Sequence, residues 1–145
     1  PSRGLGDVYK RQTPSNAEYM DRTNWSGTLG EGVENVIGNI FDGNTGSDIA
    51  ANSAPWEFTL DLGAETTMLG ANTRHWGSGY APRSIEVLTS PDNATWKSHG
   101  TLAVSGGTQN WRFLKPVTAR YLRYRVMSPN GRTDVTEFNI YVAKQ

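Results

Sequence analysis

The sequence contains no cysteine, no long apolar run and no excess of one charge sign. The missing cysteine excludes a disulfide scaffold, a thiol nucleophile and a cysteine-ligated zinc site. No stretch approaches the ~20 apolar residues of a membrane helix, so we expect no membrane insertion. Since 14 basic residues balance 14 acidic ones, nothing favours nucleic acid or an anionic membrane as the main partner.

Helical periodicity is also scarce, whereas alternation of apolar and polar residues is frequent. In Trp56–Gly63 (WEFTLDLG) every second residue is apolar, which is typical of a half-buried strand. Glycine-rich turns and five tryptophans complete the pattern of a β-sandwich with functional loops. A short helical turn is expected within residues 33–44. Strands are predicted over Met20–Gly27, Trp56–Gly63, Thr67–Thr73, Ser84–Ser90, Ala94–His99, Thr101–Val104, Asn110–Phe113, Ala119–Met127 and Glu137–Ala143.

The first twelve residues, Pro1–Gln12, have no hydrophobic period. Read back into codons, Ser2–Gln12 matches one frame of an adapter that is attached to DNA fragments in transposon-based sequencing. We therefore interpret residues 1–12 as non-native, or else as a disordered tail, and assign the domain to residues 13–145. On this interpretation we expect further domains of the natural chain upstream.

Four motifs, in this order, resemble the discoidin domain, which is also called the coagulation factor V and VIII C-type domain. Its bacterial branch includes the family 32 carbohydrate-binding modules. The motifs are IFDGN (Ile40–Asn44), WEFTLDLG (Trp56–Gly63), PRSIEVLTSPDNATW (Pro82–Trp96), and the pair ARYLRYRV and TEFNIYV (residues 119–126 and 136–142). The resemblance spans roughly Met20–Ala143 and implies an all-β, jelly-roll β-sandwich of the galactose-binding-domain-like class.

The resemblance also implies a structural calcium ion beside the Asp-Gly-Asn loop. Calcium takes six to eight oxygen ligands, and a glycine-containing turn can aim carbonyl oxygens inward. Matched by motif, the ligands are the carboxylates of Asp42 and Glu137, the carbonyl oxygens of Asn39, Asn44 and Thr136, and the hydroxyl of Ser47. The alternative is an Asx-type turn with a solvated carboxylate. Ser47-Asp48-Ile49 replaces the family's Thr-x-Trp, which makes Asp48 an alternative ligand.

The candidate ligand-binding loop is RHWGSGYAPR (Arg74–Arg83). A sugar offers CH faces and hydroxyl edges, so an aromatic ring with planar polar groups around it suits a glycan. The candidate sugar-binding residues are Trp76, His75, Tyr80, Arg74 and Arg83 in this loop, together with Asn52, Asn130 and Arg132 in neighbouring loops.

Each main candidate in this loop has a structural alternative. Trp76 fits a buried plug at a strand end as well as a stacking platform, His75 fits a hydrogen-bonding loop residue, and Arg83 fits a scaffold ion pair. Trp56 and Trp96 align with family core positions, whereas Trp25 and Trp111 are not assigned. The sugar-contacting histidine that relatives carry after Thr-x-Trp is absent, so a galactose preference does not carry over.

The resemblance and the aromatic loop together predict a non-catalytic carbohydrate-binding module of a larger exported bacterial protein. Its location would be extracellular, at the cell surface or periplasmic, and its partner a glycan or polysaccharide. The first alternative is a protein- or lipid-binding adhesion domain, as in the animal relatives. The second is a glycoside hydrolase, which needs two carboxylates facing each other across the scissile bond. Since no acidic pair stands in a catalytic motif, we expect no enzymatic activity.

Overall fold

The computed structural model describes residues 9–145. The prediction of a non-native or disordered tail falls mostly on residues 1–8, which lie outside the described residues. Tyr9–Lys10 forms a short strand, β1, that pairs antiparallel with Phe113 and Arg112 of β8 (Thr108–Ser128). Tyr9 and Lys10 are therefore part of a regular strand and are not disordered. The pairing does not bear on whether residues 1–12 are native.

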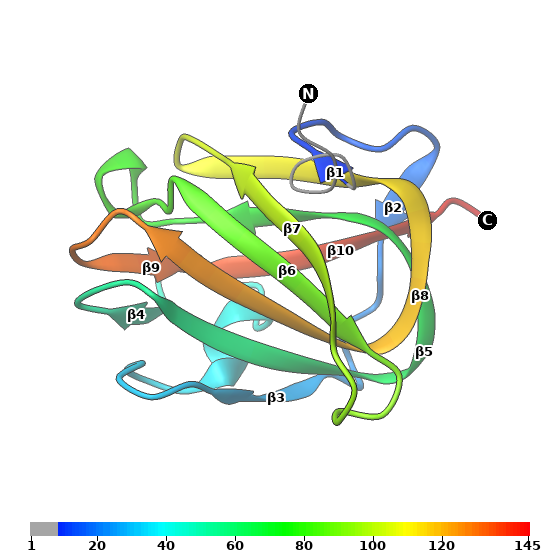
Figure 1. Cartoon of the computed structure of the whole chain (residues 1–145), viewed down its shortest axis with the longest axis horizontal. Helices are drawn as coiled ribbons and strands as arrows, with labels where there is room; N and C mark the ends of the chain where they lie inside the picture. Colours follow the sequence, from blue (N-terminus) through cyan, green and yellow to red (C-terminus); the bar gives the residue numbers. More distant parts are fainter. Residues whose placement is uncertain (1–8) are drawn as a thin grey trace.

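The chain forms a jelly-roll β-sandwich of antiparallel strands, in which two long strands, β5 (Trp56–Arg74) and β8, bend through both layers (Figure 1). The other elements are β2 (Ala17–Tyr19), β3 (Ser26–Leu29), η1 (Ile37–Ile40), β4 (Ile49–Ala51), η2 (Ser78–Tyr80), β6 (Ser84–Ser90), β7 (Lys97–Ala103), β9 (Thr133–Val135) and β10 (Glu137–Ala143). One layer contains β3, β6 and β7 with the first part of β5 and the last part of β8. The other contains β1, β2 and β10 with the remaining parts, and the β4–β9 pair lies at one end.

The predicted separation of Trp56–Gly63 from Thr67–Thr73 is wrong, because both belong to β5. Between Asp61 and Thr66 the register with β8 shifts, and Gly63 has φ +87°. Glycine adopts this left-handed backbone without the steric cost that a Cβ brings. Gly63, which was predicted to end a strand, therefore lies at a bend within β5. The predicted strands Asn110–Phe113 and Ala119–Met127 are likewise joined in β8.

Two further strands begin later than predicted, because an aspartate forms a turn before each of them. Asp21 Oδ1 accepts the backbone N–H of Thr23 at 2.8 Å, so the predicted strand Met20–Gly27 reduces to β3, which begins at Ser26. Asp92 Oδ1 accepts the backbone N–H groups of Ala94 and Thr95 at 2.9 and 2.8 Å. That turn delays β7 to Lys97, and β7 also takes in most of the predicted strand 101–104. The expected helical turn is confirmed as η1.

The core lies between the layers, around the mutually packed rings of Phe58, Tyr124 and Phe138. Trp56 belongs to it, as predicted, and so do Trp25 and Trp111. The core prediction for Trp96 is wrong. Its half-buried ring lies outside the core cluster, and the Arg123 guanidinium stacks over it, 4.0 Å from the ring centroid.

The end of the sandwich at the left of Figure 1 carries loops 75–83, 104–107 and 129–132, whereas the C-terminus emerges at the right. The β4–β9 pair closes the loop-bearing end. No helix within residues 9–145 is long and apolar enough to cross a membrane.

Candidate functional site

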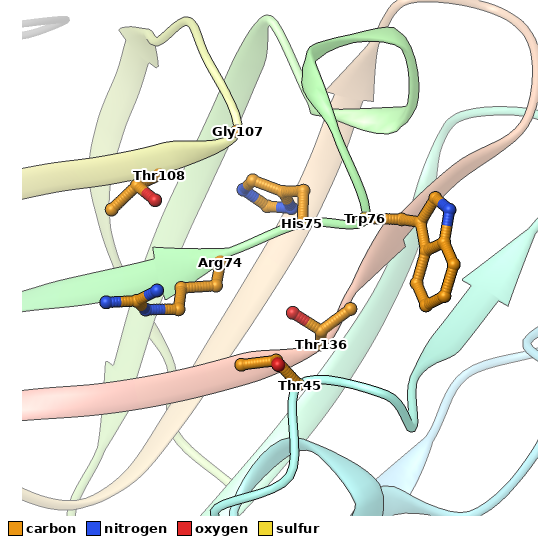
Figure 2. Close-up of a pocket in the computed structure, with 7 residues that line it drawn as sticks. All are labelled: Thr45, Arg74, His75, Trp76, Gly107, Thr108 and Thr136. Carbon is orange, nitrogen blue, oxygen red and sulfur yellow. The ribbon is translucent and has the colours of Figure 1, made fainter.

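A hollow of about 300 Å³ lies where β5 ends and β10 begins (Figure 2). It is lined by Thr45, Arg74, His75, Trp76, Gly107, Thr108 and Thr136. These residues come from four segments that are far apart in sequence, and β-pairing brings three of them together, since Arg74 lies opposite both Thr108 and Glu137. We call this hollow the Trp76 groove.

Arg74 and Trp76 lie on one side of the chain because side chains alternate along an extended backbone. Figure 2 shows both on the side of Thr45 and Thr136, while the His75 ring points the other way. The Trp76 side chain is 64% exposed. Trp76 is therefore not a buried plug, and its ring is free to stack on a ligand.

Two hydrogen bonds to Asp134 of β9 anchor the start of the loop, one at the Trp76 backbone and one at the His75 ring. The Trp76 N–H donates to Asp134 Oδ1 at 3.0 Å, and the His75 ring Nδ1 lies 2.7 Å from the Asp134 carbonyl oxygen. Burial lowers the pKa of His75, although the bond to the Asp134 carbonyl partly opposes the shift. A buried neutral His75 holds the loop in place. This agrees better with the alternative of a hydrogen-bonding loop residue than with direct ligand contact.

The Asp134 carboxyl forms an acidic pair with Asp48 that the sequence did not reveal. Burial, chiefly, and the neighbouring Asp48 raise the pKa of Asp134 to about 6, while the Trp76 N–H partly opposes this. Asp134 is only 3% exposed, whereas the two carboxyls of a glycosidase flank a bound scissile bond. A buried carboxyl cannot take that place.

The remaining candidate sugar-binding residues lie outside the Trp76 groove. Arg132 donates from both terminal nitrogens to the Glu34 carboxylate at 2.9 Å, and from Nη1 to Asn52 Oδ1 at 2.8 Å. The structure thus joins Asn52 and Arg132 to each other, but in a separate cluster. Tyr80, Arg83 and Asn130 are exposed on adjacent loops and do not line the groove.

The predicted calcium ligands gather beside the groove. Ser47 Oγ lies 2.6 Å from Asp42 Oδ2, 3.1 Å from the Asn44 carbonyl oxygen and 3.4 Å from that of Asn39. Burial would raise the pKa of Asp42, but the hydrogen bonds that it accepts from the Ser47 hydroxyl and the Asn44 N–H hold it below its usual value. Several oxygens converging on one point are the donor set that calcium prefers, so these residues fit the ion.

Glu137 connects this loop to β10. Its Oε2 accepts the Gly43 N–H at 3.1 Å, and its Oε1 pairs with Arg22 Nη1 at 2.7 Å. Thr136 is buried at the start of β10, and its N–H donates to the Arg74 carbonyl at 2.7 Å. Among residues 9–145 no three acidic or histidine side chains form a metal cluster, so calcium here would depend on carbonyl ligands.

Sequence reasoning missed Thr45, Thr108 and Asp134 as parts of the site, and it missed Arg22 as the partner of Glu137. Arg22 and Glu137 are 115 residues apart, and His75 and Asp134 are 59 apart. No local motif marks such pairs. Only the antiparallel alignment of β10 with β5 could have brought Thr136 and Glu137 to Arg74.

Solved structures of similar fold include a chitobiase domain and two family 32 carbohydrate-binding modules. The C-terminal domain of a chitobiase from Bacteroides fragilis has a TM-score of 0.74 and 18% identity, over 85% of this chain and 96% of that one. The family 32 module of NanJ from Clostridium perfringens, in complex with galactose, has a TM-score of 0.70 and 13% identity, over 86% and 98%. The family 32 module of AlyQ, in complex with 4,5-unsaturated mannuronic acid, has a TM-score of 0.63 and 22% identity, over 85% and 97%.

At these identities the similarity shows a common fold. No curated protein matches the chain. The family description "F5/8 type C domain" matches residues 20–139, which is most of the chain and nearly the range of the motifs from Met20 to Ala143. The chain therefore belongs to the F5/8 type C, or discoidin, domain family.

Proposed function

We propose that this chain is a non-catalytic carbohydrate-binding domain whose Trp76 groove holds a glycan. The observation that carries the proposal is the 64% exposed Trp76 ring on the rim of a hollow with threonine hydroxyls and a guanidinium. An indole face packs against the CH face of a sugar, and the polar groups bond its hydroxyls. The family 32 modules of similar fold support this assignment.

The absence of catalysis is part of the proposal. Three acidic side chains near the groove are engaged: Glu137 pairs with Arg22, Glu34 pairs with Arg132, and the buried Asp134 accepts the Trp76 N–H. We place the domain in a larger exported bacterial protein, where it would raise the local concentration of an attached domain on its glycan. The chitobiase domain of similar fold supports this context.

Calcium would stabilise the loop beside the groove. We propose the ligands predicted from the motif, namely Asn39, Asp42, Asn44, Ser47, Thr136 and Glu137. The ion would supply positive charge where the Asp42 and Glu137 carboxyls meet and so fix Thr45 at the edge of the groove. Glycan contact would remain with the protein's own side chains.

A glycan array probed with the full chain and with Trp76→Ala tests the proposal. We expect the wild type to bind a defined set of glycans with modest affinity, because few contacts offset the cost of ordering a sugar. Trp76→Ala should abolish binding while circular dichroism stays unchanged. Tyr19→Ala removes another exposed aromatic ring, 49% exposed on β2, and should bind like the wild type.

The contrary outcomes are distinct. A wild-type chain that binds no glycan on a broad array contradicts the carbohydrate assignment. If Trp76→Ala retains full binding, the chain binds carbohydrate at another surface. Hydrolysis of an arrayed glycan or of a model glycoside by the wild-type chain would contradict the non-catalytic assignment.

A further inference from the structure

Within residues 9–145, Arg74 differs from most of the other arginines because it has no acidic partner there. In the described part of the chain, five guanidinium groups form ion pairs with carboxylates at 2.7–3.3 Å. These five are Arg22, Arg120, Arg123, Arg125 and Arg132. Arg74 is exposed, lines the Trp76 groove and forms no ion pair with any residue among 9–145. A charged group with no protein partner in a candidate binding site is available to a ligand.

The position of Arg74 suits a ligand that also covers Trp76. Both side chains line the groove, and Figure 2 shows Thr45 and Thr136 between them. An arginine guanidinium is planar and presents parallel N–H donors that match a carboxylate or a sulfate. A sugar ring stacked on Trp76 would therefore direct an acidic substituent, on the same or the next sugar, to Arg74.

The other charges near the groove do not cancel this preference. Arg22 neutralises Glu137, and Arg132 neutralises Glu34. Asp134 is only 3% exposed and lies behind the Trp76 backbone, whose N–H it accepts. Asp42 lies in the adjacent loop, where its carboxylate accepts hydrogen bonds from Ser47 and Asn44. Arg74 therefore supplies positive charge on the open side of the groove.

From these observations we propose that the glycan is negatively charged and that Arg74 pairs with its acid group. This inference rests on the proposed function and adds the chemical class of the ligand. It leaves Trp76 as the stacking platform and makes Arg74 the residue that selects an acidic sugar over a neutral one of the same shape.

Paired probes test the inference with the full-length chain. The first pair is uronic acid oligosaccharides and the same oligosaccharides with their carboxyl groups reduced to alcohols. The second pair is sulfated oligosaccharides and their desulfated forms. We expect the wild type to bind one acidic form at least about tenfold tighter than its neutral counterpart, the difference that a charge-assisted hydrogen bond typically brings. That preference should weaken as salt concentration rises.

Variants locate the preference. Arg74→Gln should lower affinity for the acidic form about tenfold more than it lowers affinity for the neutral form, whereas Arg74→Lys should restore part of the preference. Lys115→Gln is the matched control, because it removes an exposed positive charge from the bend of β8 and should change nothing. Equal binding of acidic and neutral forms through Trp76, or an acidic preference that survives Arg74→Gln, overturns this inference and leaves the glycan-binding proposal standing. Binding of no probe and no arrayed glycan contradicts both.

Discussion

Asp134 is a buried acid that holds the backbone of an exposed aromatic residue. Its carboxyl accepts the Trp76 N–H, and its carbonyl oxygen meets the His75 ring. Burial and Asp48 raise its pKa to about 6. An acid whose pKa is raised on folding favours the folded state while it is protonated. This contribution is complete below about pH 4 and is lost as the pH rises through 6.

Asp134→Asn should therefore stabilise the chain at pH 7.5 by an amount on the order of 2 kcal/mol. The amide oxygen can still accept the Trp76 N–H, and the amide carries no charge beside Asp48. The gain should shrink as the pH falls from 7.5 to 4.5, which thermal unfolding of both proteins at three pH values would measure.

Asp92→Asn serves as the opposite control. Hydrogen bonds from the backbone N–H groups of Thr95 and Ala94 lower the pKa of Asp92, so the stabilising contribution of its carboxylate is fully present above about pH 4. This variant should therefore lose the same stability at pH 4.5 as at pH 7.5. A difference between Asp134→Asn and the wild type that stays constant across the pH range would contradict the role assigned to Asp134.

At the scale of single residues, the sequence was a better guide to which residue could contact a ligand than to which residues it contacts within the protein. The stacking candidate Trp76 was predicted from its loop, because aromatic residues among glycines are typical of binding loops. The burial of His75 was not predictable, since it depends on Asp134 from a strand 59 residues away. The place of Trp56 in the core followed from strand alternation. The place of Trp96 outside the core was not predictable, because it depends on the Arg123 guanidinium that lies across its ring.

At the scale of elements, the pairing of β5 with β8 leaves no room for a side chain at Gly70. A Cβ at this position would meet the Trp111 carbonyl oxygen of β8 and would lie 2.7 Å from Arg112 Cα. The register between β5 and β8 also shifts between Met68 and Gly70. Both obstacles are backbone atoms, which cannot move aside without disturbing the pairing of β5 with β8.

Gly70→Ala should therefore lower the free energy of unfolding by about 2 kcal/mol, the usual cost of overpacking. Urea unfolding monitored by tryptophan fluorescence would measure the change. Gly38→Ala is the control, because no atom lies within 4 Å of a Cβ built there, and it should be nearly neutral. Equal stability of the two variants would contradict the close approach.

Alternation predicted the position and type of most strands but not their continuity. Ser84–Ser90 and Glu137–Ala143 match β6 and β10. Gly63 was interpreted as a strand end, yet β5 continues past it because β8 supplies hydrogen-bond partners on the far side of the bend. Whether a glycine ends or bends a strand depends on that partner, which the local sequence does not specify.

At the scale of the whole molecule, the loop over residues 39–47 joins the first third of the chain to its last strand. Glu137 of β10 accepts the Gly43 N–H and pairs with Arg22. We expect a bound calcium ion to strengthen this connection. At a calcium concentration of 100 Kd the ion would stabilise the fold by about 2.7 kcal/mol, which corresponds to several degrees in Tm.

Thermal unfolding in calcium and in chelator would measure that gain for the wild type. Asp42→Asn should abolish the response, because it removes a carboxylate from the proposed ligands. Asp92→Asn, in an exposed turn on the opposite sheet edge, should keep it. A wild-type Tm that is the same in both conditions would contradict the calcium site and leave the Asx-type turn as the explanation of this loop.

The separation of the Trp76 loop from the C-terminus has a practical consequence. The loop lies at one end of the sandwich and the C-terminus at the other (Figure 1). A biotin acceptor tag placed after Gln145 would tether the domain to a sensor surface with its groove facing the flowing solution. Surface immobilisation by this route would leave Trp76 unobstructed, whereas random coupling through lysines would orient the molecules in many directions and mask a fraction of the sites.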